Sequence, residues 1–228
     1  MTGTLYGIGV GPGDPELMTV KAWRLISMAK VIAYLSANES ESTARNIARH
    51  FISDDVEEIA INMPMRVERE PARLAYDEGA RKIAAHLEKG EDVVMLCEGD
   101  PFFYGSFMYM YERLAASFTT IVVPGVTSIT AAAAAIGQPL CERDDVLKVL
   151  PATLVEEDLH RELSTTNAAA IIKVGRHFAK VKRVLTTLHL EHHATAVEYA
   201  THEKQVIRDV TQISEDTLPY FTTIIVRT

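Results

Sequence analysis

Residues 92–101 read DVVMLCEGDP, an apolar run that ends at a corner built from glycine and proline. A continuous apolar run of this length predicts a buried strand, and Gly99 with Pro101 predicts a sharp turn after it. The same arrangement occurs twice more: residues 4–10 lead into a corner at 11–15, and residues 120–123 lead into a corner at 124–127. Each of the three corners is therefore expected to follow the end of a strand.

Helical patterns separate these strands along the first half of the chain. Apolar residues at spacings of three and four predict helices over 20–30, 42–51, 72–88 and 104–115, and short apolar runs predict further strands at 31–35 and 57–61. This alternation predicts an α/β fold with a mostly parallel sheet and helices on both faces. Because ligands bind at the carboxyl ends of such strands, the three corners should face one crevice.

The second half has a different pattern. Strands are predicted at 145–150, 168–174, 194–199, 205–210 and 221–226, with helices at 154–163 and 178–188. Strands follow strands here, so we expect a mixed sheet with helices. We place the domain boundary near 137–141, between an N-terminal α/β domain of residues 1–137 and a C-terminal α/β domain of residues 141–228.

Composition narrows the function. The chain has 228 residues, 47% of them hydrophobic, and a formal net charge of -8. An acidic surface of this kind argues against a nucleic-acid partner, although a local cationic pocket remains compatible with an anionic small molecule. Cys97 and Cys141 form no CxxC and no metal-type spacing, the first residues lack a signal-peptide pattern, and no apolar run approaches a membrane span. We therefore expect a cytoplasmic protein without a metal and without a membrane partner.

The corners carry little chemistry when each is taken alone. GIGVGPGD at residues 7–14 fails the G-x-G-x-x-G pattern, because the last glycine falls on Pro12 or on Asp14, and this argues against a nicotinamide-dinucleotide enzyme. Asp100 either caps the following segment or accepts a hydrogen bond from a ligand. Thr127 and Ser128 either cap the alanine-rich helix that follows or hold a ligand carboxylate at its N-terminus.

Three longer stretches carry a family resemblance. VGPGDPELMTVKA at 10–22, VMLCEGDPFFYGSFMYMYERL at 94–114 and VVPGVTSITAAAAAIGQPL at 122–140 resemble the tetrapyrrole methylase family in order and spacing. The resemblance covers essentially the whole chain. It implies a two-domain fold, a homodimer, and S-adenosylmethionine bound in the cleft between the domains.

The resemblance also implies which residues bind the cofactor. Those residues are Pro12, Glu98, Gly99, Asp100, Phe103, Thr127, Ser128, Val174, Ala200 and Thr222. Val174 and Ala200 match positions that touch the adenine mainly through backbone groups.

Within the family, the chain looks most like the precorrin-2 C20-methyltransferases. KVIAYL at 30–35, CEGDPFFYGSFMY at 97–109, DDVLKVLPATL at 144–154 and IIKVGR at 171–176 carry this likeness. Uroporphyrinogen-III methyltransferases have Tyr-Asp where this chain has Tyr34-Leu35, which argues against that activity. The resemblance thus implies methylation of C20 of precorrin-2 to give precorrin-3A in cobalamin biosynthesis.

The reaction and its substrate indicate further candidate residues. A base must take a proton from the methylated carbon unless solvent does so, and the carboxylates of Asp14 and Glu98 are the candidates. The substrate carries several carboxylates, for which the donors are expected among Tyr34, Arg66, Arg69, Arg73 and Arg176. Three alternatives stay open: C20 methylation of the cobalt-bearing substrate, methylation of another tetrapyrrole carbon, and a module that binds S-adenosylmethionine without catalysis.

Overall fold

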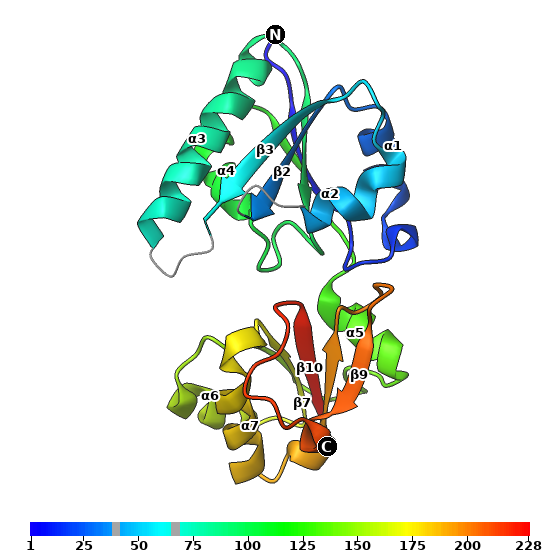
Figure 1. The fold of residues 1–228 in the computed structure, drawn as a ribbon, viewed down its shortest axis with the longest axis vertical. Helices are drawn as coiled ribbons and strands as arrows, with labels where there is room; N and C mark the ends of the chain where they lie inside the picture. Colours follow the sequence, from blue (N-terminus) through cyan, green and yellow to red (C-terminus); the bar gives the residue numbers. More distant parts are fainter. Residues whose placement is uncertain (38–41, 65–68) are drawn as a thin grey trace. The chain divides into compact units, whose positions relative to one another are not determined.

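The computed structural model describes residues 1–228 except 38–41 and 65–68, and for Arg69 it describes the backbone alone. The chain divides into two compact units, Met1–Thr127 and Ser128–Thr228. Each unit is built on a five-stranded sheet. The elements are drawn in Figure 1.

The first unit is a parallel α/β layer. Its strands are β1 (Leu5–Gly9), β2 (Val31–Ala37), β3 (Glu57–Met63), β4 (Val93–Cys97) and β5 (Thr120–Val123). Its helices are α1 (Val20–Ser27), α2 (Thr43–Ala48), α3 (Arg69–Glu88) and α4 (Phe107–Leu114), with short 3-10 turns η1 (Pro15–Leu17) and η2 (Arg49–Phe51). The strands lie in the order β3-β2-β4-β1-β5, and every pairing between them is parallel.

Two apolar cores cover the two faces of this sheet. Ile83 of α3 and Phe107 of α4 pack with Met95 on one face, whereas Ile26 of α1 and Ile47 of α2 form the core on the other. Figure 1 shows the two helix pairs on opposite sides of the strands. Successive residues of a strand point to opposite faces, so the all-apolar β4 serves both cores. The predicted parallel sheet with helices on both faces is confirmed.

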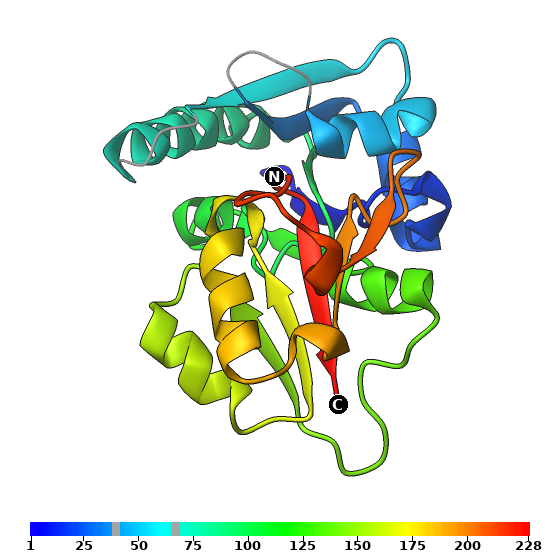
Figure 2. The ribbon, with the colours of Figure 1, turned by 60° about the horizontal axis from the view of Figure 1, so that its bottom comes forward.

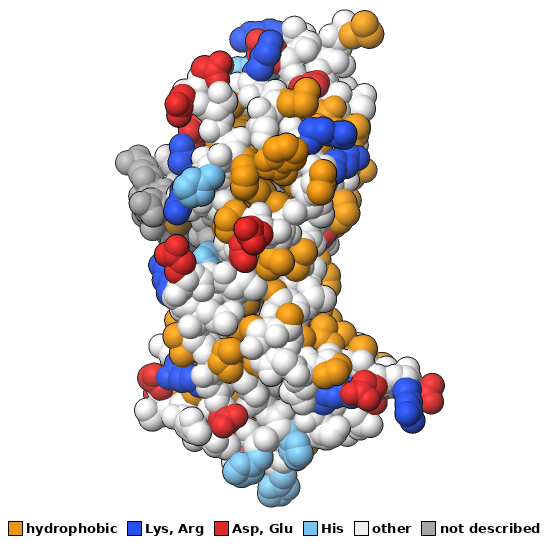
Figure 3. Space-filling view, turned by 90° about the vertical axis from the view of Figure 1, so that its right-hand side faces the viewer, with side chains coloured by type: hydrophobic (Ala, Val, Ile, Leu, Met, Phe, Trp, Pro, Cys, Tyr) orange, Lys and Arg blue, Asp and Glu red, His pale blue; other side chains and the backbone are white. Residues whose placement is uncertain are grey.

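Helix α1 shows why the chain folds this way locally. The Thr19 hydroxyl accepts a hydrogen bond from the Ala22 amide at 3.1 Å, which caps the helix. Ala22 and Ile26, four residues apart, lie on its buried side. Its other side leaves Val20, Trp23 and Met28 exposed, and Figure 3 shows hydrophobic side chains gathered on this side of the first unit.

The second unit contains a mixed sheet. Its strands are β6 (Leu147–Pro151), β7 (Ala168–Ile172), β8 (Ala194–Glu198), β9 (Val206–Asp209) and β10 (Thr222–Arg227), in the order β6-β7-β10-β8-β9. Its helices are α5 (Ser128–Ile136), α6 (Glu156–Leu163) and α7 (Phe178–Thr187), with 3-10 turns η3 (Gly175–His177), η4 (Glu191–His193) and η5 (Val210–Gln212). β6 runs parallel to β7, while β10 is antiparallel to both β7 and β8. The predicted mixed sheet is confirmed.

Helices cover this sheet from both sides. α6 and α7 build one core with Ile171 and Ile224, and α5 contacts β8 and β10. Thr223, which points to the face opposite Ile224, has its hydroxyl 3.4 Å from that of Ser128 at the start of α5. Figure 2 shows α6 and α7 on one side of the strands and α5 on the other.

The division between the units differs from the boundary expected at 137–141. The alanine-rich α5 belongs to the second unit, because its small apolar residues pack against that sheet. Strong helix-forming composition indicated the helix, but nothing in the composition indicated which sheet it would contact.

Several elements end earlier than the apolar pattern predicted, for a backbone reason. The strand expected over 168–174 ends at Ile172, where Lys173 adopts a φ of 56°, and the strand expected over 194–199 ends at Glu198, where Tyr199 has a φ of 50°. The helix expected from residue 104 begins at Phe107, after Tyr104 with a φ of 56°. A left-handed residue cannot continue a strand or a right-handed helix.

Candidate functional site

The three glycine corners meet at the carboxyl edge of the first sheet. β4, β1 and β5 are adjacent parallel strands, so the segments that follow them leave the sheet side by side. Gly11 and Gly99 form an antiparallel bridge, in which the Gly99 amide donates to the Gly11 carbonyl at 2.8 Å. A Cβ placed on Gly125 would lie 2.1 Å from the Gly99 carbonyl oxygen and 2.9 Å from the Cα of Gly9. Only glycine allows the backbones to cross this closely, and the predicted convergence of the corners is confirmed.

Gly99 leaves an open side at this crossing. It has a φ of 63°, and a Cβ there would meet only the Val126 carbonyl oxygen, at 3.8 Å. The backbone of residues 98–100 can therefore be approached closely by a ligand from that side. Close approach of this kind lets main-chain groups bind the polar end of a small ligand.

The Asp100 carboxylate is bound by the protein backbone. Its Oδ1 accepts hydrogen bonds from the Phe102 and Phe103 amides at 2.9 and 3.0 Å, and its Oδ2 accepts one from the Gly125 amide at 3.0 Å. The structure thus shows the turn-capping alternative for Asp100, together with an unexpected link to the next corner. Phe103, a predicted cofactor residue, is positioned by this turn, and its ring meets that of Tyr104 edge-on.

Glu98 lies at the carboxyl end of β4 and points toward α2. Its Oε1 accepts a hydrogen bond from the Ala44 amide at 3.1 Å, in the first turn of that helix. Burial raises the pKa of Glu98 above its ordinary value of 4.5, although the backbone hydrogen bonds to its carboxylate oppose the shift. A desolvated carboxyl group with a raised pKa is a candidate proton acceptor at a site of this kind.

The neighbouring Cys97 is a poor nucleophile. Burial raises the pKa of its thiol to about 11, so the thiol stays protonated near neutral pH.

The first corner holds the other candidate carboxylate. Asp14 caps η1, because its Oδ1 accepts the Glu16 amide at 2.8 Å. This capping hydrogen bond gives the Asp14 carboxylate a structural role. Pro12 lies half-buried in the same corner, one residue after the Gly11 bridge.

The second unit gathers its predicted cofactor residues at one edge of its sheet. Val174 follows β7, Ala200 follows β8, and Thr222 begins β10, which is antiparallel to both strands; their ends therefore lie at the same edge. All three residues are buried, and the Thr222 hydroxyl donates to the Pro219 carbonyl at 2.8 Å.

This edge is also where the backbone is strained. Lys173, Tyr199 and Thr201, the residues flanking Val174 and Ala200, have φ values of 56°, 50° and 67°. Left-handed residues other than glycine cost free energy and concentrate at ligand-binding turns. The edge is therefore a candidate for the backbone contacts to adenine that the sequence predicted.

Similarity to known proteins agrees with this arrangement. Residues 4–215 match the family model described as Tetrapyrrole (Corrin/Porphyrin) Methylases. The chain belongs to this family of tetrapyrrole methylases. The family resemblance predicted from the sequence is confirmed.

Individual tetrapyrrole methylases resemble the chain over nearly its full length. It is 41% identical over 227 residues to the cobalamin biosynthesis protein CobIJ of Mycobacterium tuberculosis strain H37Rv; the match covers 96% of this chain but only 45% of that relative. The chain therefore spans about half the length of that relative. It is also 37% identical over 232 residues to the precorrin-2 C(20)-methyltransferase of a Sinorhizobium species, covering 98% of this chain and 95% of the relative.

A solved structure shows the same fold. The uroporphyrin-III C-methyl transferase of Thermus thermophilus, complexed with S-adenosyl homocysteine, matches with a TM-score of 0.68 at 22% identity, over 98% of this chain and 97% of that one. At this level of identity the likeness concerns the fold. It agrees with the two-sheet architecture described above.

The predicted substrate residues of this tetrapyrrole methylase are spread over both units. Tyr34 lies on β2, where burial and the nearby Glu58 carboxylate raise the pKa of its phenol. Arg73 is exposed and pairs with Glu70 at 2.8 Å, so its guanidinium belongs to a solvated ion pair. Arg176 is exposed in η3, with its Nε 3.5 Å from the His177 ring. Arg66 lies outside the described residues, and the side chain of Arg69 does as well.

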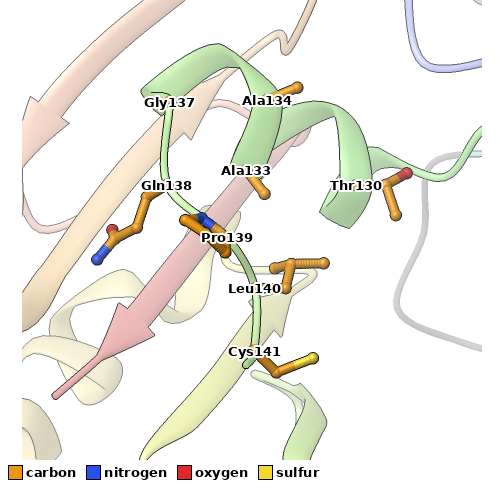
Figure 4. Close-up of a pocket in the computed structure, with 8 residues that line it drawn as sticks. All are labelled: Thr130, Ala133, Ala134, Gly137, Gln138, Pro139, Leu140 and Cys141. Atoms are coloured by element: carbon orange, nitrogen blue, oxygen red, sulfur yellow. The ribbon is translucent and has the colours of Figure 1, made fainter. Parts of the chain in front are cut away.

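A pocket of about 450 Å³ lies away from these residues, at the C-terminal end of α5. Figure 4 shows its lining: Thr130, Ala133, Ala134, Gly137, Gln138, Pro139, Leu140 and Cys141. None of these side chains carries a positive charge, so the pocket does not suit a substrate with several carboxylates. The described residues contain no cluster of histidine, cysteine and carboxylate side chains that could hold a metal ion. No helix within the described ranges is both long and apolar enough to cross a membrane.

Sequence reasoning missed two structural features of the site. It did not predict that Gly9 and Gly125 touch, nor that the first turn of α2 receives the Glu98 carboxylate. Glycine at a strand end was the only available signal for the first feature. The second joins residues 54 positions apart and has no local signal.

Proposed function

We propose that the chain is an S-adenosylmethionine-dependent methyltransferase that methylates C20 of precorrin-2 to give precorrin-3A in cobalamin biosynthesis. The observation that carries this proposal is the near full-length similarity to the precorrin-2 C(20)-methyltransferase of Sinorhizobium. The glycine crossing at the carboxyl edge of the first sheet supports it, because that edge is where α/β sheets bind their ligands.

The first unit supplies contacts for the methionine and ribose portions of the cofactor. The open side of Gly99 admits the ligand to the backbone of Glu98, Gly99 and Asp100, and Pro12 and Phe103 flank that backbone in the proposal. Thr127, the last residue of this unit, is a further proposed contact, and Ser128, which begins α5 in the second unit, is proposed as a contact from that unit. In this region main-chain groups bind the cofactor, since the Asp100 carboxylate already accepts hydrogen bonds from three backbone amides.

The second unit supplies contacts for the adenine. Val174 and Ala200 present main-chain groups at strand ends held by left-handed neighbours, and Thr222 lies at the same edge. Fixed main-chain donors and acceptors suit the planar edge of a nucleobase, because their geometry is set before binding.

Bound S-adenosylmethionine supplies a methyl group that its sulfonium already activates, so the chain's own task is mainly to position the substrate and move a proton. Positioning alone provides effective molarities on the order of 10⁵–10⁸ M. In that chemistry the bond between the cofactor sulfur and its methyl group would break as C20 took the methyl group, S-adenosylhomocysteine would be the leaving product, and C20 would then give up its proton. Glu98 accepts that proton, because its pKa is raised, whereas Asp14 caps η1.

Cationic side chains receive the substrate carboxylates. The proposed cationic donors are Arg66, Arg69, Arg73 and Arg176, and the phenol of Tyr34 is a further proposed contact to the substrate. Arg176 lies in η3, beside the edge of the second sheet. The pKa of His177 next to it is lowered mainly by burial and also by the positive charges of Lys180 and Arg176. We further propose that the protein forms a homodimer and is located in the cytoplasm.

The test is a methyl-transfer assay. The purified protein is incubated with methyl-labelled S-adenosylmethionine and freshly generated precorrin-2, in metal-free and cobalt-bearing forms, and the product is analysed by mass spectrometry. We expect one added methyl group, at C20 of the metal-free substrate. Transfer only to uroporphyrinogen-III, or only to the cobalt form, would overturn the substrate assignment, and cofactor binding without transfer would indicate a binding module.

A further inference from the structure

The Asp100 carboxylate joins two of the three corners. Its Oδ1 organises its own turn through the Phe102 and Phe103 amides, and its Oδ2 reaches across to the Gly125 amide at 3.0 Å. The latter bond spans 25 positions of sequence and connects the segment after β4 with the segment after β5.

We propose that Asp100 is a positioning residue: it holds the 98–101 and 124–127 corners at the spacing that cofactor binding requires, and its carboxylate does not contact the ligand. This inference rests on the proposed function and deepens it. It assigns to Asp100 a role different from the direct ligand contact that the family resemblance implies.

Both oxygens of the Asp100 carboxylate are hydrogen-bonded by the protein itself. Three backbone amides donate to the two oxygens at 2.9–3.0 Å, in the range of ordinary hydrogen bonds. A ligand amine or hydroxyl would meet a carboxylate that already accepts three of the roughly four hydrogen bonds it can take. A carboxylate bonded in this way acts on a ligand through the backbone that it holds.

The backbones of the corners cross at a very short distance. Beside the Asp100–Gly125 bond, Gly125 approaches Gly99 and Gly9 so closely that an added Cβ on Gly125 would overlap both. The same crossing places Gly99 so that one side of its backbone is open to a ligand. The bond from Asp100 fixes a distance that the three glycines merely permit.

The substitution D100N acts on the hydrogen bond between the two corners. The D100N side chain keeps the size of the original and one oxygen, which can still accept the Phe102 and Phe103 amides. Its amide nitrogen would face the Gly125 N–H, and two donors repel where a donor and a charged acceptor met before. D100N therefore removes the link between corners while leaving the local turn in place.

The experiment compares D100N with D92N in the full chain. Asp92 is a matched control: its Oδ1 also accepts a backbone amide, that of Thr4 at 2.7 Å, but it precedes β4 and so lies at the edge of the sheet opposite the corners. Binding of S-adenosylhomocysteine is measured by calorimetry, KM and kcat by the transfer assay, and the exchange of the Gly125 amide by nuclear magnetic resonance without ligand. Urea unfolding reports the stability of each variant.

We expect D100N to bind S-adenosylhomocysteine about tenfold more weakly than wild type, with a raised KM for the cofactor and an unchanged KM for the tetrapyrrole. The Gly125 amide should exchange faster in D100N. D92N should match wild type in its affinity for S-adenosylhomocysteine and in the exchange of the Gly125 amide. If D92N lost as much stability as D100N and also bound S-adenosylhomocysteine more weakly, the proposal would be overturned, because general destabilisation would then explain the weaker binding of D100N. Unchanged affinity in D100N would overturn it too, while leaving the proposed function intact.

The ligand-free readout separates the two proposals. If wild type bound no cofactor, the proposed function would fail, and the cofactor part of this inference with it. Unchanged Gly125 exchange in D100N would instead remove the link between the corners, whatever the wild type binds.

Discussion

At the scale of single residues, Glu98 and Asp100 show two uses of a carboxylate on one corner. Asp100 has both oxygens engaged by backbone amides, whereas Glu98 has its Oε1 on the Ala44 amide. The pKa of Glu98 is raised by burial, since removing a charge from water costs more than these hydrogen bonds return. This difference is why we assign proton transfer to Glu98 and positioning to Asp100.

Replacing Glu98 by glutamine should reduce kcat while leaving the fold intact. The glutamine carbonyl can still accept the Ala44 amide, but it cannot take a proton near neutral pH. We expect kcat to fall by about 10²–10⁴-fold, the usual contribution of a general base, with KM values close to wild type. A kcat within about twofold of wild type would show that Glu98 only anchors α2.

The same variant has a pH signature in stability. The folded-state pKa of Glu98 lies above 4.5, so as pH rises past 4.5 the unfolded chain loses this proton first and the folded state loses stability relative to it. Glutamine does not titrate, and E98Q should therefore become more stable relative to wild type as pH rises from about 4.5 toward neutrality.

Glu58 serves as a control, because its pKa is shifted in the direction opposite to that of Glu98. Its hydrogen bonds to Arg45 lower its pKa below 4.5, so the stability it contributes is present above 4.5 and is lost as pH falls through the folded-state pKa. E58Q should therefore lose stability relative to wild type as pH rises, in urea unfolding at a series of pH values. Parallel trends in the two variants would contradict one of the two assignments: a gain in both would contradict that of Glu58, and a loss in both would contradict that of Glu98.

At the scale of elements, the strands and helices follow from local pattern, but their ends do not. The apolar run of β4 and the three- and four-residue spacing of α1 can be recognised in the sequence because burial dictates them. The left-handed residues Tyr104, Lys173 and Tyr199 cannot, since none is glycine and only tertiary contacts hold them there. The candidate site lies where these unpredictable ends occur, so its residues were found through family resemblance.

Lys173 offers a test of strain at a strand end. Glycine adopts its φ of 56° without the penalty paid by lysine, so K173G should leave stability unchanged or raise it by up to about 1 kcal/mol. The freed strand end should bind S-adenosylhomocysteine more weakly, by about three- to tenfold, because the backbone beside Val174 is no longer fixed before binding. Calorimetry and urea unfolding measure the two effects.

Arg143 is the matched control for this change. It is also an exposed basic residue with a positive φ, 46°, but it lies before β6 and away from the ends of β7 and β8. R143G should show the same effect on stability and no effect on affinity. Equal affinity in K173G and wild type would mean that the strained edge has no part in cofactor binding.

At the scale of the whole molecule, the chain consists of two units, of which the first has a hydrophobic core on each face of its sheet and the second has its own core. Apolar patterning predicted a parallel sheet followed by a mixed one, because strand spacing and connection length are local properties. It placed the boundary after α5 rather than before it, because an alanine-rich helix is apolar all round and does not reveal its partner.

Fragments of the chain distinguish the two boundaries. Residues 128–228 keep α5 on β8 and β10, whereas residues 138–228 lose the helix and its buried Ile129 and expose β10 residues such as Ile225. Losing the burial of one isoleucine side chain costs about 1.5–3 kcal/mol, a large part of the stability of a small domain. We therefore expect 128–228 to unfold cooperatively in urea, with dispersed amide resonances, and 138–228 to show neither property. Cooperative unfolding of 138–228 at similar stability would instead place α5 outside the folding unit, and failure of both fragments would mean that the second sheet does not fold without Met1–Thr127.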